Sequence, residues 1–574
     1  MNHNRQQDPV YIGIKENGIK MRLRKNKKEK ENMTGGRSGR NPVVQYAGIL
    51  SYMLLLIMRI PLIGMIGDAG MGLFAPAFEI FVLVTLLTSY SMTGAMSGII
   101  RYRVKREQYK SAKKAFQAAF LMDLLISAVF ALALLGLSGM IADILILESM
   151  SYMAVMVTAP VIVFAAFIGT FRGYFNGYGL GVLTAHSQYI EKISMIICVL
   201  CCGSVLYRYG EKVSALRQDD VYSFAHGALG AMIGVLLSQI ITTVYLLVIY
   251  VIYSGTLRGK LGMDGSKRIE TQYSMQRVIL ANCLPLAVIA ILSNVYMLID
   301  QRMFNYCMNK KELGGVRTAL WGSYYGRLAV LIGLGACCVI LSIYTMPGKI
   351  SNSYDREEYR VMRDRISRAV RRVCLVGFPV AVYLAALADS TAACLIKGGN
   401  EDLASWIRAG AVIIVLYGFC FLLGQLMYKI HMFRELLAVT AGSLLLHWII
   451  AYLFVQKALM GAEGIIAALI ISFAANGALS FYFVSRHLKY RQEWLSGMAF
   501  PAAAAAVSGL AVMLVDKFLL ASLGGLPTIL IGVLTGLILY VAFLMILRVI
   551  GEEELSHIPL GFFFIMLGKN LGIF

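Results

Sequence analysis

The chain has 574 residues, of which 58% are hydrophobic and only 15% are charged. Its mean hydropathy is +0.70. A soluble globular domain carries about 25% charged residues, so this composition excludes a water-soluble enzyme or binding module and indicates a membrane protein. The net charge of +21 fits basic loops on one face of a membrane, and nucleic acid is not expected as a partner.

The sequence contains fourteen apolar runs that are long enough to cross a bilayer as helices. A helix rises 1.5 Å per residue and the hydrocarbon layer is about 30 Å thick, so each crossing needs roughly 20 residues. Lipid cannot satisfy exposed backbone polar groups, and we therefore predict an all-α polytopic membrane protein with about 14 transmembrane helices. The runs are 43–66, 73–100, 115–137, 152–171, 182–207, 224–253, 278–299, 319–346, 370–396, 404–428, 436–455, 465–484, 498–520 and 529–550.

A basic connector is present twice in the sequence, 250 positions apart. It covers residues 105–116 and 355–366, and each copy links the second and third apolar runs of a six-run block. This repeat predicts two pseudo-symmetric six-helix lobes. The predicted segments are a basic arm at 1–42, a first lobe at 43–254, a second lobe at 274–488, two appended helices at 498–550 and a short tail at 551–574.

Loop charges and short motifs bear on the topology and the chemistry. Basic residues collect in the arm and after the second, sixth and eighth runs, so the positive-inside rule predicts that both termini are cytoplasmic. No polar segment carries a phosphate-binding glycine loop, a His/Cys cluster with metal-ligand spacing or a nucleophile elbow. We therefore expect a transporter, not an enzyme, with no cofactor and no metal.

Charged residues inside the apolar runs are the candidate functional residues, because charge near the bilayer centre is costly. Arg59 in the first run and Glu79 in the second both lie roughly 10 to 12 Å below the outer end of their helices, so they form either a structural ion pair or part of a cavity. Arg327 lies roughly 15 Å deep. The repeat maps it onto Ala77, so we expect Arg327 and Glu79 to approach one cavity and Arg327 to contact an anion; a structural arginine bonded to helix carbonyls is the alternative.

Other charged residues allow two interpretations each. Asp123 in the third run is a cavity candidate, or it pairs with a cytoplasmic lysine. Asp300 and Arg302 end the seventh run, where we expect them to cap the helix at the outer surface. His447 stands in the apolar eleventh run, either as a proton relay or as a core histidine whose hydrogen bonds are satisfied.

Two segments resemble a known family signature. Residues 171–177 read Phe-Arg-Gly-Tyr-Phe-Asn-Gly, and residues 187–191 read Ser-Gln-Tyr-Ile-Glu. They are similar to the Arg-Gly-Tyr-Phe-Gln-Gly and Ser-Gln-x-x-Glu motifs of polysaccharide-biosynthesis and stage V sporulation protein B-like transporters, which belong with the lipid II flippases to the multidrug, oligosaccharidyl-lipid and polysaccharide exporter superfamily. The motif residues in this chain are Arg172, Gly173, Gly177, Ser187, Gln188, Glu191 and, in a Leu-Ile-Asp match, Asp300.

The resemblance implies two lobes around a central cavity and a flippase function in the bacterial cytoplasmic membrane. The implied substrate is a polyprenyl-pyrophosphate-linked saccharide or peptidoglycan precursor, moved outward by alternating access. Arg59 and Arg327 would bind the phosphate, while Glu79 and Asp123 would tune the cavity charge or couple transport to an ion. Membrane lipids and a coupling ion are the other implied partners, and the appended helices would line a groove for the lipid tail. Met195 departs from the family pattern, which usually has a basic residue there.

Two alternatives remain open at this point. An ion-coupled exporter of cationic drugs should have a net acidic cavity, and the two arginines and two carboxylates counted above do not favour it. A membrane scaffold for cell-wall or spore-envelope synthesis would transport nothing, and buried arginines would then serve packing alone.

Overall fold

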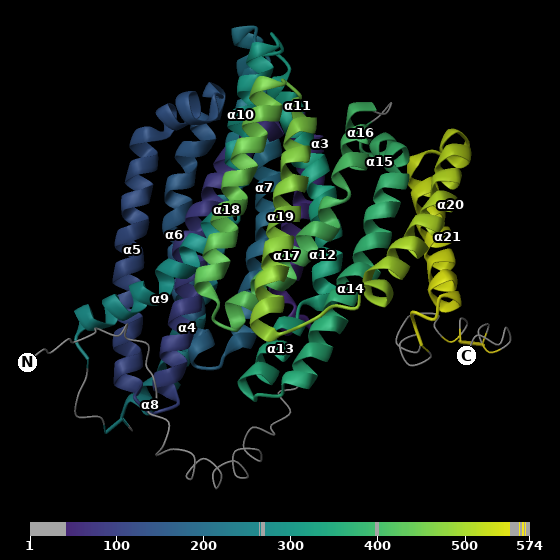
Figure 1. Cartoon of the computed structure of the whole chain (residues 1–574). Coiled ribbons are helices and arrows are strands. Elements are labelled where there is room, and N and C mark those ends of the chain that lie inside the picture. The colour runs from purple at the N-terminus through teal and green to yellow at the C-terminus, as the bar shows by residue number, and fades with distance from the viewer. Residues whose placement is uncertain are drawn as a thin grey trace, which may run out of the picture. The chain divides into compact units, whose positions relative to one another are not determined.

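The computed structural model of the chain is entirely helical within the residues that it describes (Figure 1). These residues are 42–262, 264–265, 270–396 and 401–551, with a few further positions in the C-terminal tail. The predicted basic arm therefore lies outside the described residues, as does most of the tail. Ala47–Phe574 forms one compact unit.

The first half of the chain supplies six of the predicted crossings. Ala47–Val104 is a continuous helical stretch of 58 residues, about 87 Å at 1.5 Å per residue and far too long for one crossing. It turns at Gly67, whose φ of 73° is in the left-handed region that favours glycine. The elements are α2 Pro42–Gln45, α3 Ala47–Thr85, η1 Leu86–Tyr90, α4 Ser91–Val104, α5 Tyr109–Met140, η2 Ile141–Ile146, η3 Ser149–Ser151, α6 Tyr152–Gly177, α7 Gly181–Arg217 and α8 Val221–Gly262.

The second half supplies the next six crossings, and several of them are interrupted. The seventh run is divided into α9 and α10 by a turn at residues 293–295. The elements are α9 Gln272–Leu292, α10 Tyr296–Lys310, α11 Arg317–Ser323, η4 Tyr324–Leu328, α12 Ala329–Ile343, α13 Met346–Asp355, α14 Tyr359–Ala386, α15 Ala388–Leu395, α16 Glu401–Gly410, α17 Ile413–Lys429, α18 Phe433–Ala451, η5 Tyr452–Lys457 and α19 Ala462–Leu488. Among the η elements of the chain, η3 is a 3₁₀-helix and the others are π-helices.

Two appended crossings follow, η6 Leu495–Ala499 with α20 Phe500–Leu523, and α21 Gly525–Ile546. They stand at the edge of the bundle beside α14 and α15 (yellow in Figure 1). Ala504 and Ala505 of α20 are buried, and Gly509 lies so close to Val382 of α14 that a methyl group there would collide with it. The small residues at these positions therefore serve tight helix packing, whereas Ala503 is exposed.

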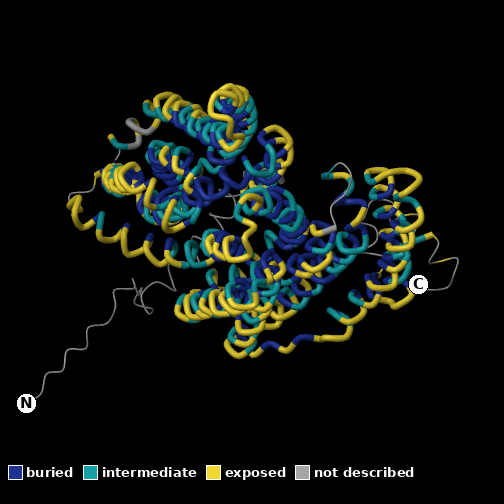
Figure 2. The backbone as a smooth tube through the Cα atoms, turned by 90° about the horizontal axis from the view of Figure 1, so that it is seen from above, coloured by how far each residue is buried: buried dark blue, intermediate teal, exposed yellow. Residues whose placement is uncertain are grey.

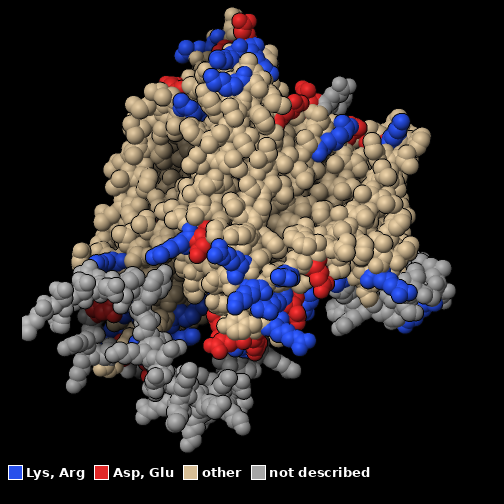
Figure 3. Space-filling model, viewed as in Figure 1, with Lys and Arg blue, Asp and Glu red and all other residues tan. Residues whose placement is uncertain are grey.

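The predicted fold class is confirmed. Thirteen described helical stretches are long and apolar enough to cross a membrane. Because Ala47–Val104 contains two of the predicted runs, the thirteen stretches account for all fourteen crossings. Figure 3 shows the resulting pattern on one face of this multi-pass membrane protein, an apolar belt with Lys, Arg, Asp and Glu gathered at its two ends.

Two names are useful for these ends. We call the end with the turns at 105–108 and 356–358 the connector end, and the end with the turns at 147–148, 218–220 and 311–316 the far end. The sequence predicts that the connector end is cytoplasmic, because both copies of the basic connector lie there.

The hydrophobic core shows how the two halves meet. At the far end one cluster joins them, with Phe78 and Ile162 from the first half and Trp321 and Tyr325 from the second. At the connector end each half has a cluster of its own, and the cluster of the first half also takes in one face of α9. Figure 2 shows the buried interior enclosed by exposed outer helix faces. One continuous cluster therefore joins the halves at the far end, whereas at the connector end it is mainly α9 that packs on the first half.

Candidate functional site

Two adjoining cavities lie between the halves of the molecule. The near chamber, toward the connector end, has a volume of about 290 Å³, and the deep chamber has about 190 Å³. Both are lined by Ser293, Asn294, Tyr296, Tyr417 and Phe473. The first half contributes Leu86 and Tyr90 to the near chamber and Tyr52, Leu56, Arg59 and Glu79 to the deep chamber. All other lining residues come from the second half.

The break in the seventh helix forms the shared wall of the two chambers. Ser293 and Asn294 occupy the turn between α9 and α10 and line both cavities. Non-helical backbone at membrane depth is tolerated where it lines a polar cavity, and interrupted helices often form the binding site of a transporter. The broken helix thus indicates a binding site independently of the chemistry of the lining side chains.

The ceiling of the deep chamber is a cluster of three residues from both halves. Arg59 Nη2 donates to Glu79 Oε1 at 3.4 Å, and the Tyr325 hydroxyl donates to the same oxygen at 2.6 Å. The Arg59 guanidinium also stacks on the Tyr325 ring, 4.0 Å from its centroid. Arg59 and Glu79 therefore lie at one level, as the sequence predicted.

Arg59 keeps hydrogen-bonding capacity within this cluster. Its long bond to Glu79 is the sole hydrogen bond that its guanidinium makes to the described residues, and its Nε is buried with no partner among them. The side chain is only 7% exposed. A guanidinium carries five N–H donors, so several of them are left for an anion or for water.

Arg327 does not share this cavity, contrary to the prediction. It forms an ion pair with Asp68 and lines a separate cavity of about 80 Å³ beside Ile60, Ile63 and Gly64 of α3. The reason is local. In the π-helical turn η4, Tyr324 and Tyr325 lie toward the deep chamber, and Arg327, two residues farther on, lies on the other side of the helix.

Arg327 belongs to a set of contacts that join the halves at the far end. Besides the Asp68–Arg327 pair, Glu148 accepts hydrogen bonds from Arg317 at 3.3 Å and from Thr318 at 2.6 Å. Asn305 donates to the carbonyl of Ile146 at 2.9 Å, and Arg302 to that of Ile144 at 2.6 Å. We call these five contacts the far-end seal. They bridge the two halves at the far end.

Glycines allow the halves to come this close at the seal. A methyl group at Gly72 would collide with the backbone of Thr318, and one at Gly322 with the backbone of Asp68. Neither Glu148 nor Arg317 was predicted from the sequence as a functional residue. In the sequence, Glu148 lies in an acidic turn and Arg317 is a basic residue next to a loop, and such patterns are too common to indicate a function.

Asp123 lies outside both chambers, which corrects the prediction of a cavity role. It is buried and its Oδ2 accepts a hydrogen bond from Thr170 at 2.9 Å. Its surroundings are a narrow gap between α5 and α6, lined by Phe120 and Phe167. The helix face that carries Asp123 packs within the first half, so depth in the membrane alone did not identify a cavity residue.

Asp300 and His447 form a buried pair at the deep chamber. The prediction that Asp300 caps a helix at the surface is wrong, because it is fully buried and accepts from or donates to His447 Nε2 at 2.7 Å. The helix continues past the apolar run as α10 to Lys310, so Asp300 sits near its start. Asp300 lines the deep chamber, whose charged lining is therefore one arginine and two carboxylates.

The family motif holds the first half together away from the chambers. Arg172 donates to Ser187 at 2.8 Å and to Glu191 at 2.7 Å. Lys192 also contacts Glu191, at 2.6 Å, and Gln188 is half-buried on the same helix. These bonds tie α6 to α7.

The motif glycines pack α6 against α4. A methyl group at Gly173 would lie 2.9 Å from the Met96 side chain, and one at Gly177 would lie 2.5 Å from that of Ile100. Both distances are too short for real contacts, so only glycine fits. These motif residues of α6 and α7 therefore serve packing within the first half and line neither chamber.

Comparisons with known proteins agree with this architecture. Residues 43–320 match the family of polysaccharide biosynthesis proteins. The chain is 22% identical to stage V sporulation protein B of Bacillus subtilis (strain 168) over 377 residues, which cover 65% of this chain and 69% of that protein. It is 20% identical to the lipid II flippase MurJ of the same organism over 465 residues, covering 78% and 82%.

Solved structures show the same fold. A lipid II flippase MurJ in an inward closed conformation superposes with a TM-score of 0.59 at 14% identity, covering 88% of this chain and 98% of that one. An inward-facing multidrug resistance transporter of the MATE family superposes with a TM-score of 0.56 at 16% identity, covering 76% and 94%. The chain is thus similar in sequence to polysaccharide biosynthesis proteins over residues 43–320, and it has the fold of the multidrug, oligosaccharidyl-lipid and polysaccharide exporter superfamily.

Proposed function

We propose that the protein is a flippase that moves a polyprenyl-pyrophosphate-linked saccharide or peptidoglycan precursor across the bacterial cytoplasmic membrane by alternating access. The observation that carries the proposal is the pair of chambers between the halves, the deeper of which is lined by the partly unpaired Arg59. Alternating access requires a substrate cavity between two lobes that can open to either side of the membrane in turn.

The chemistry of such a substrate fits the chambers. Its head group carries phosphate and sugars, which cannot cross hydrocarbon unaided, whereas its polyprenyl tail can remain in the lipid. Arginine binds phosphate oxygens through two parallel N–H groups, and Arg59 has donors to spare. The similarity to a lipid II flippase and to the family of polysaccharide biosynthesis proteins supports the same substrate class.

Depletion of the protein tests the proposal directly. If it is a flippase, the lipid-linked precursor that it carries should accumulate in the inner leaflet, where it can be extracted and identified by mass spectrometry. Re-expression of the wild-type chain should clear that precursor. An unchanged pool of every lipid-linked precursor, and an unchanged distribution between leaflets, would contradict the proposal.

Export of cationic drugs is a second candidate, and one observation favours it. The charged lining of the deep chamber is one arginine and two carboxylates, because Arg327 lies elsewhere and Asp300 lies within it. A net acidic cavity suits a cation. Overexpression should then lower the accumulation of a cationic dye such as ethidium in intact cells. The bonds of Glu79 argue against this role, since Arg59 balances its charge and the Tyr325 hydroxyl donates to the same carboxylate oxygen.

A further inference from the structure

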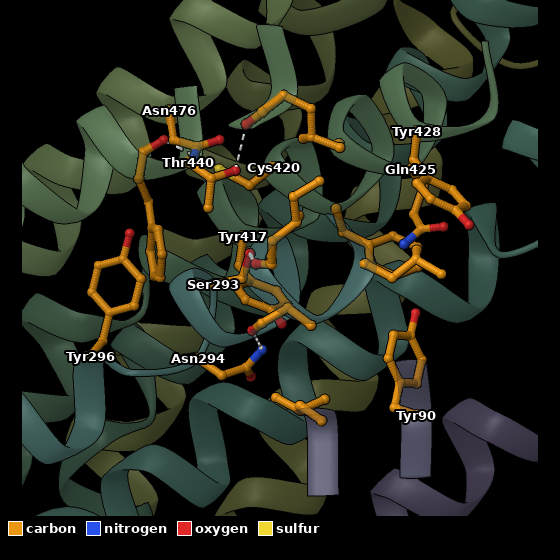
Figure 4. A pocket seen from close by; sticks show the side chains of 18 residues that line it. Tyr90, Ser293, Asn294, Tyr296, Tyr417, Cys420, Gln425, Tyr428, Thr440 and Asn476 are labelled. Carbon is orange, nitrogen blue, oxygen red and sulfur yellow. Dashed lines mark hydrogen bonds between the residues drawn. The ribbon is translucent and has the colours of Figure 1, made fainter. Parts of the chain in front are cut away.

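The near chamber is polar but carries no charge on any described lining residue. Its polar lining consists of three amides, several hydroxyls and one thiol, and Figure 4 shows how they surround the space. They come from η1, the α9–α10 turn, α10, α17, α18 and α19. These groups are Ser293, Asn294, Tyr90, Tyr296, Tyr417, Tyr428, Cys420, Gln425, Thr440 and Asn476.

The three amides differ from the small hydroxyls in how their hydrogen bonds are used. Ser293 and Thr440 each donate to a carbonyl of their own helix. Asn294 donates to the carbonyl of Ala290 at 2.8 Å, which leaves its own oxygen free, and the Asn476 oxygen accepts from a serine at 3.4 Å, which leaves its NH₂ group free. Gln425 is partly exposed, lines the chamber and makes no hydrogen bond to the described residues.

Free amides in a membrane cavity indicate a polar occupant. An amide that loses water without gaining a partner is destabilising by a few kcal/mol, so such groups persist where water or a ligand satisfies them. The chamber offers at least one acceptor, on Asn294, and donors on Asn476 and Gln425. They lie on different walls of the chamber in Figure 4.

Aromatic rings complete the wall between the amides. The Phe473 ring lies 5.7 Å from that of Tyr296 and 5.8 Å from that of Tyr417, centroid to centroid. A pyranose ring has a face of C–H groups that packs on aromatic rings and an edge of hydroxyl groups that both donate and accept hydrogen bonds. An uncharged sugar therefore matches this lining in both respects.

A charged head group does not match the near chamber. A carboxylate or ammonium group moved from water into a cavity with no counter-charge loses solvation without compensation. The charged side chains that line either chamber, Arg59, Glu79 and Asp300, all line the deep chamber.

We propose that the near chamber binds the uncharged saccharide of the lipid-linked substrate and selects against precursors whose sugar carries a charged peptide. Asn294, Gln425 and Asn476 are the specificity-determining residues. This inference rests on the proposed flippase function and narrows its substrate to a neutral glycan.

The test uses the purified full-length chain in liposomes and two synthetic probes. Both probes carry the same fluorescent polyprenyl diphosphate; one bears an uncharged N-acetylglucosamine disaccharide and the other a muramyl disaccharide with its pentapeptide. We expect the neutral probe to be moved at least about tenfold faster than the peptide-bearing probe. A binding site discriminates strongly against a ligand that leaves buried polar groups without a partner. Equal rates, or faster movement of the peptide-bearing probe, would overturn the inference and leave the flippase function standing. Movement of neither probe by the wild-type chain would count against the flippase function itself.

Variants separate specificity from folding. Gln425→Leu and Asn476→Leu should each slow the neutral probe about threefold to tenfold, the usual range for one lost hydrogen bond. Asn282→Leu is the matched control, since Asn282 is an exposed amide on α9 that lines neither chamber. Gln425→Lys should reduce the ratio of the flipping rates of the two probes, because the lysine gives the peptide carboxylates a counter-charge. Folding damage alone would slow both probes equally, so an unchanged ratio in Gln425→Lys would overturn the assignment.

Discussion

The far-end seal and the near chamber both lie between the two halves, yet they use polar groups in opposite ways. At the seal, Glu148, Asn305 and Arg302 each bond directly to the other half. In the near chamber, Gln425 bonds to nothing described and two further amides are half used. Satisfied polar groups hold the halves together, and the groups with spare hydrogen-bonding capacity face the open space of the chamber.

The deep chamber combines the two behaviours. Glu79 is satisfied by donors from both halves, whereas Arg59 beside it is not. Of these two neighbouring charged side chains, Glu79 is thus used in the structure, whereas Arg59 has donors left for binding.

The largest expected contrast is in the accessibility of the two ends, because only one of them faces the cytoplasm. Single cysteines in place of Arg106 and Arg360 at the connector end should be protected from a membrane-impermeant thiol reagent in intact cells. Cysteines in place of Asp219 and Lys311 at the far end should be labelled. All four positions are exposed, so a cysteine-free background makes labelling report the side alone. Labelling of Arg106→Cys with protection of Arg360→Cys would contradict the duplicated topology.

Removal of the Arg59 guanidinium should slow transport at least about tenfold with little loss of protein. Arg59→Ala takes away the unpaired donors, while Glu79 keeps its bond to Tyr325. A charge-assisted hydrogen bond contributes roughly 1.5–3 kcal/mol, so we expect a loss of at least about tenfold in the flipping rate, and partial activity in Arg59→Lys. The rate is measured in liposomes and the protein level by immunoblot.

The double variant separates the two roles of Arg59. If Arg59 only pairs with Glu79, the variant Arg59→Ala, Glu79→Gln should recover both activity and abundance, because no carboxylate is left buried without a cation. A stable but inactive double variant would support binding of the substrate anion.

Weakening the far-end seal should open the deep chamber toward that side. Asp68→Asn removes the charge that pairs with Arg327, so the closed arrangement loses a contact that the open one does not have. A cysteine at Met297, which lines the deep chamber, should then be labelled severalfold faster by a reagent added from the far side. Asp143→Asn is the control, an exposed carboxylate near the same end. Equal labelling rates in the two variants would show that the Asp68–Arg327 pair does not close the chamber.

The sequence was sufficient for the fold and for part of the site. The apolar runs predicted every described crossing, because helix length and lipid solvation leave little choice of structure. The level of Arg59 and Glu79 followed from the helical rise alone. The prediction failed at Arg327 and Asp123, because depth along a helix does not say which way a side chain points, and a π-helical turn changes that direction.

The second half of the site could not be read from residue depth. Asp300 was placed at the surface because the hydropathy of the seventh run ends there, whereas α10 continues as a mixed-polarity helix buried by its neighbours. The near-chamber amides carry no charge and match no motif, so nothing local distinguishes Gln425 from an exposed glutamine. Only the break between α9 and α10 and the packing of α17, α18 and α19 bring these residues together.

The appended helices offer the smallest expected effect and extend the same comparison to a third region. Ala505 of α20 is fully buried, and Ala503, two positions earlier, is exposed. If this surface is packed as the seal is, Ala505→Trp should destabilise the protein by roughly 1–3 kcal/mol and lower its abundance, while Ala503→Trp should change stability by less than about 0.5 kcal/mol. Thermal denaturation in detergent compares the two.

Flipping rates per folded molecule complete this last experiment. A packed surface predicts that the Ala505→Trp molecules that do fold still transport at the wild-type rate, since the substitution removes no group that lines either chamber. A groove for the lipid tail predicts the reverse, normal abundance with slow transport. Because a tail would contact the exposed face of α20, slow transport in Ala503→Trp with unchanged stability would place the groove there and show that the appended helices are not packing surface alone.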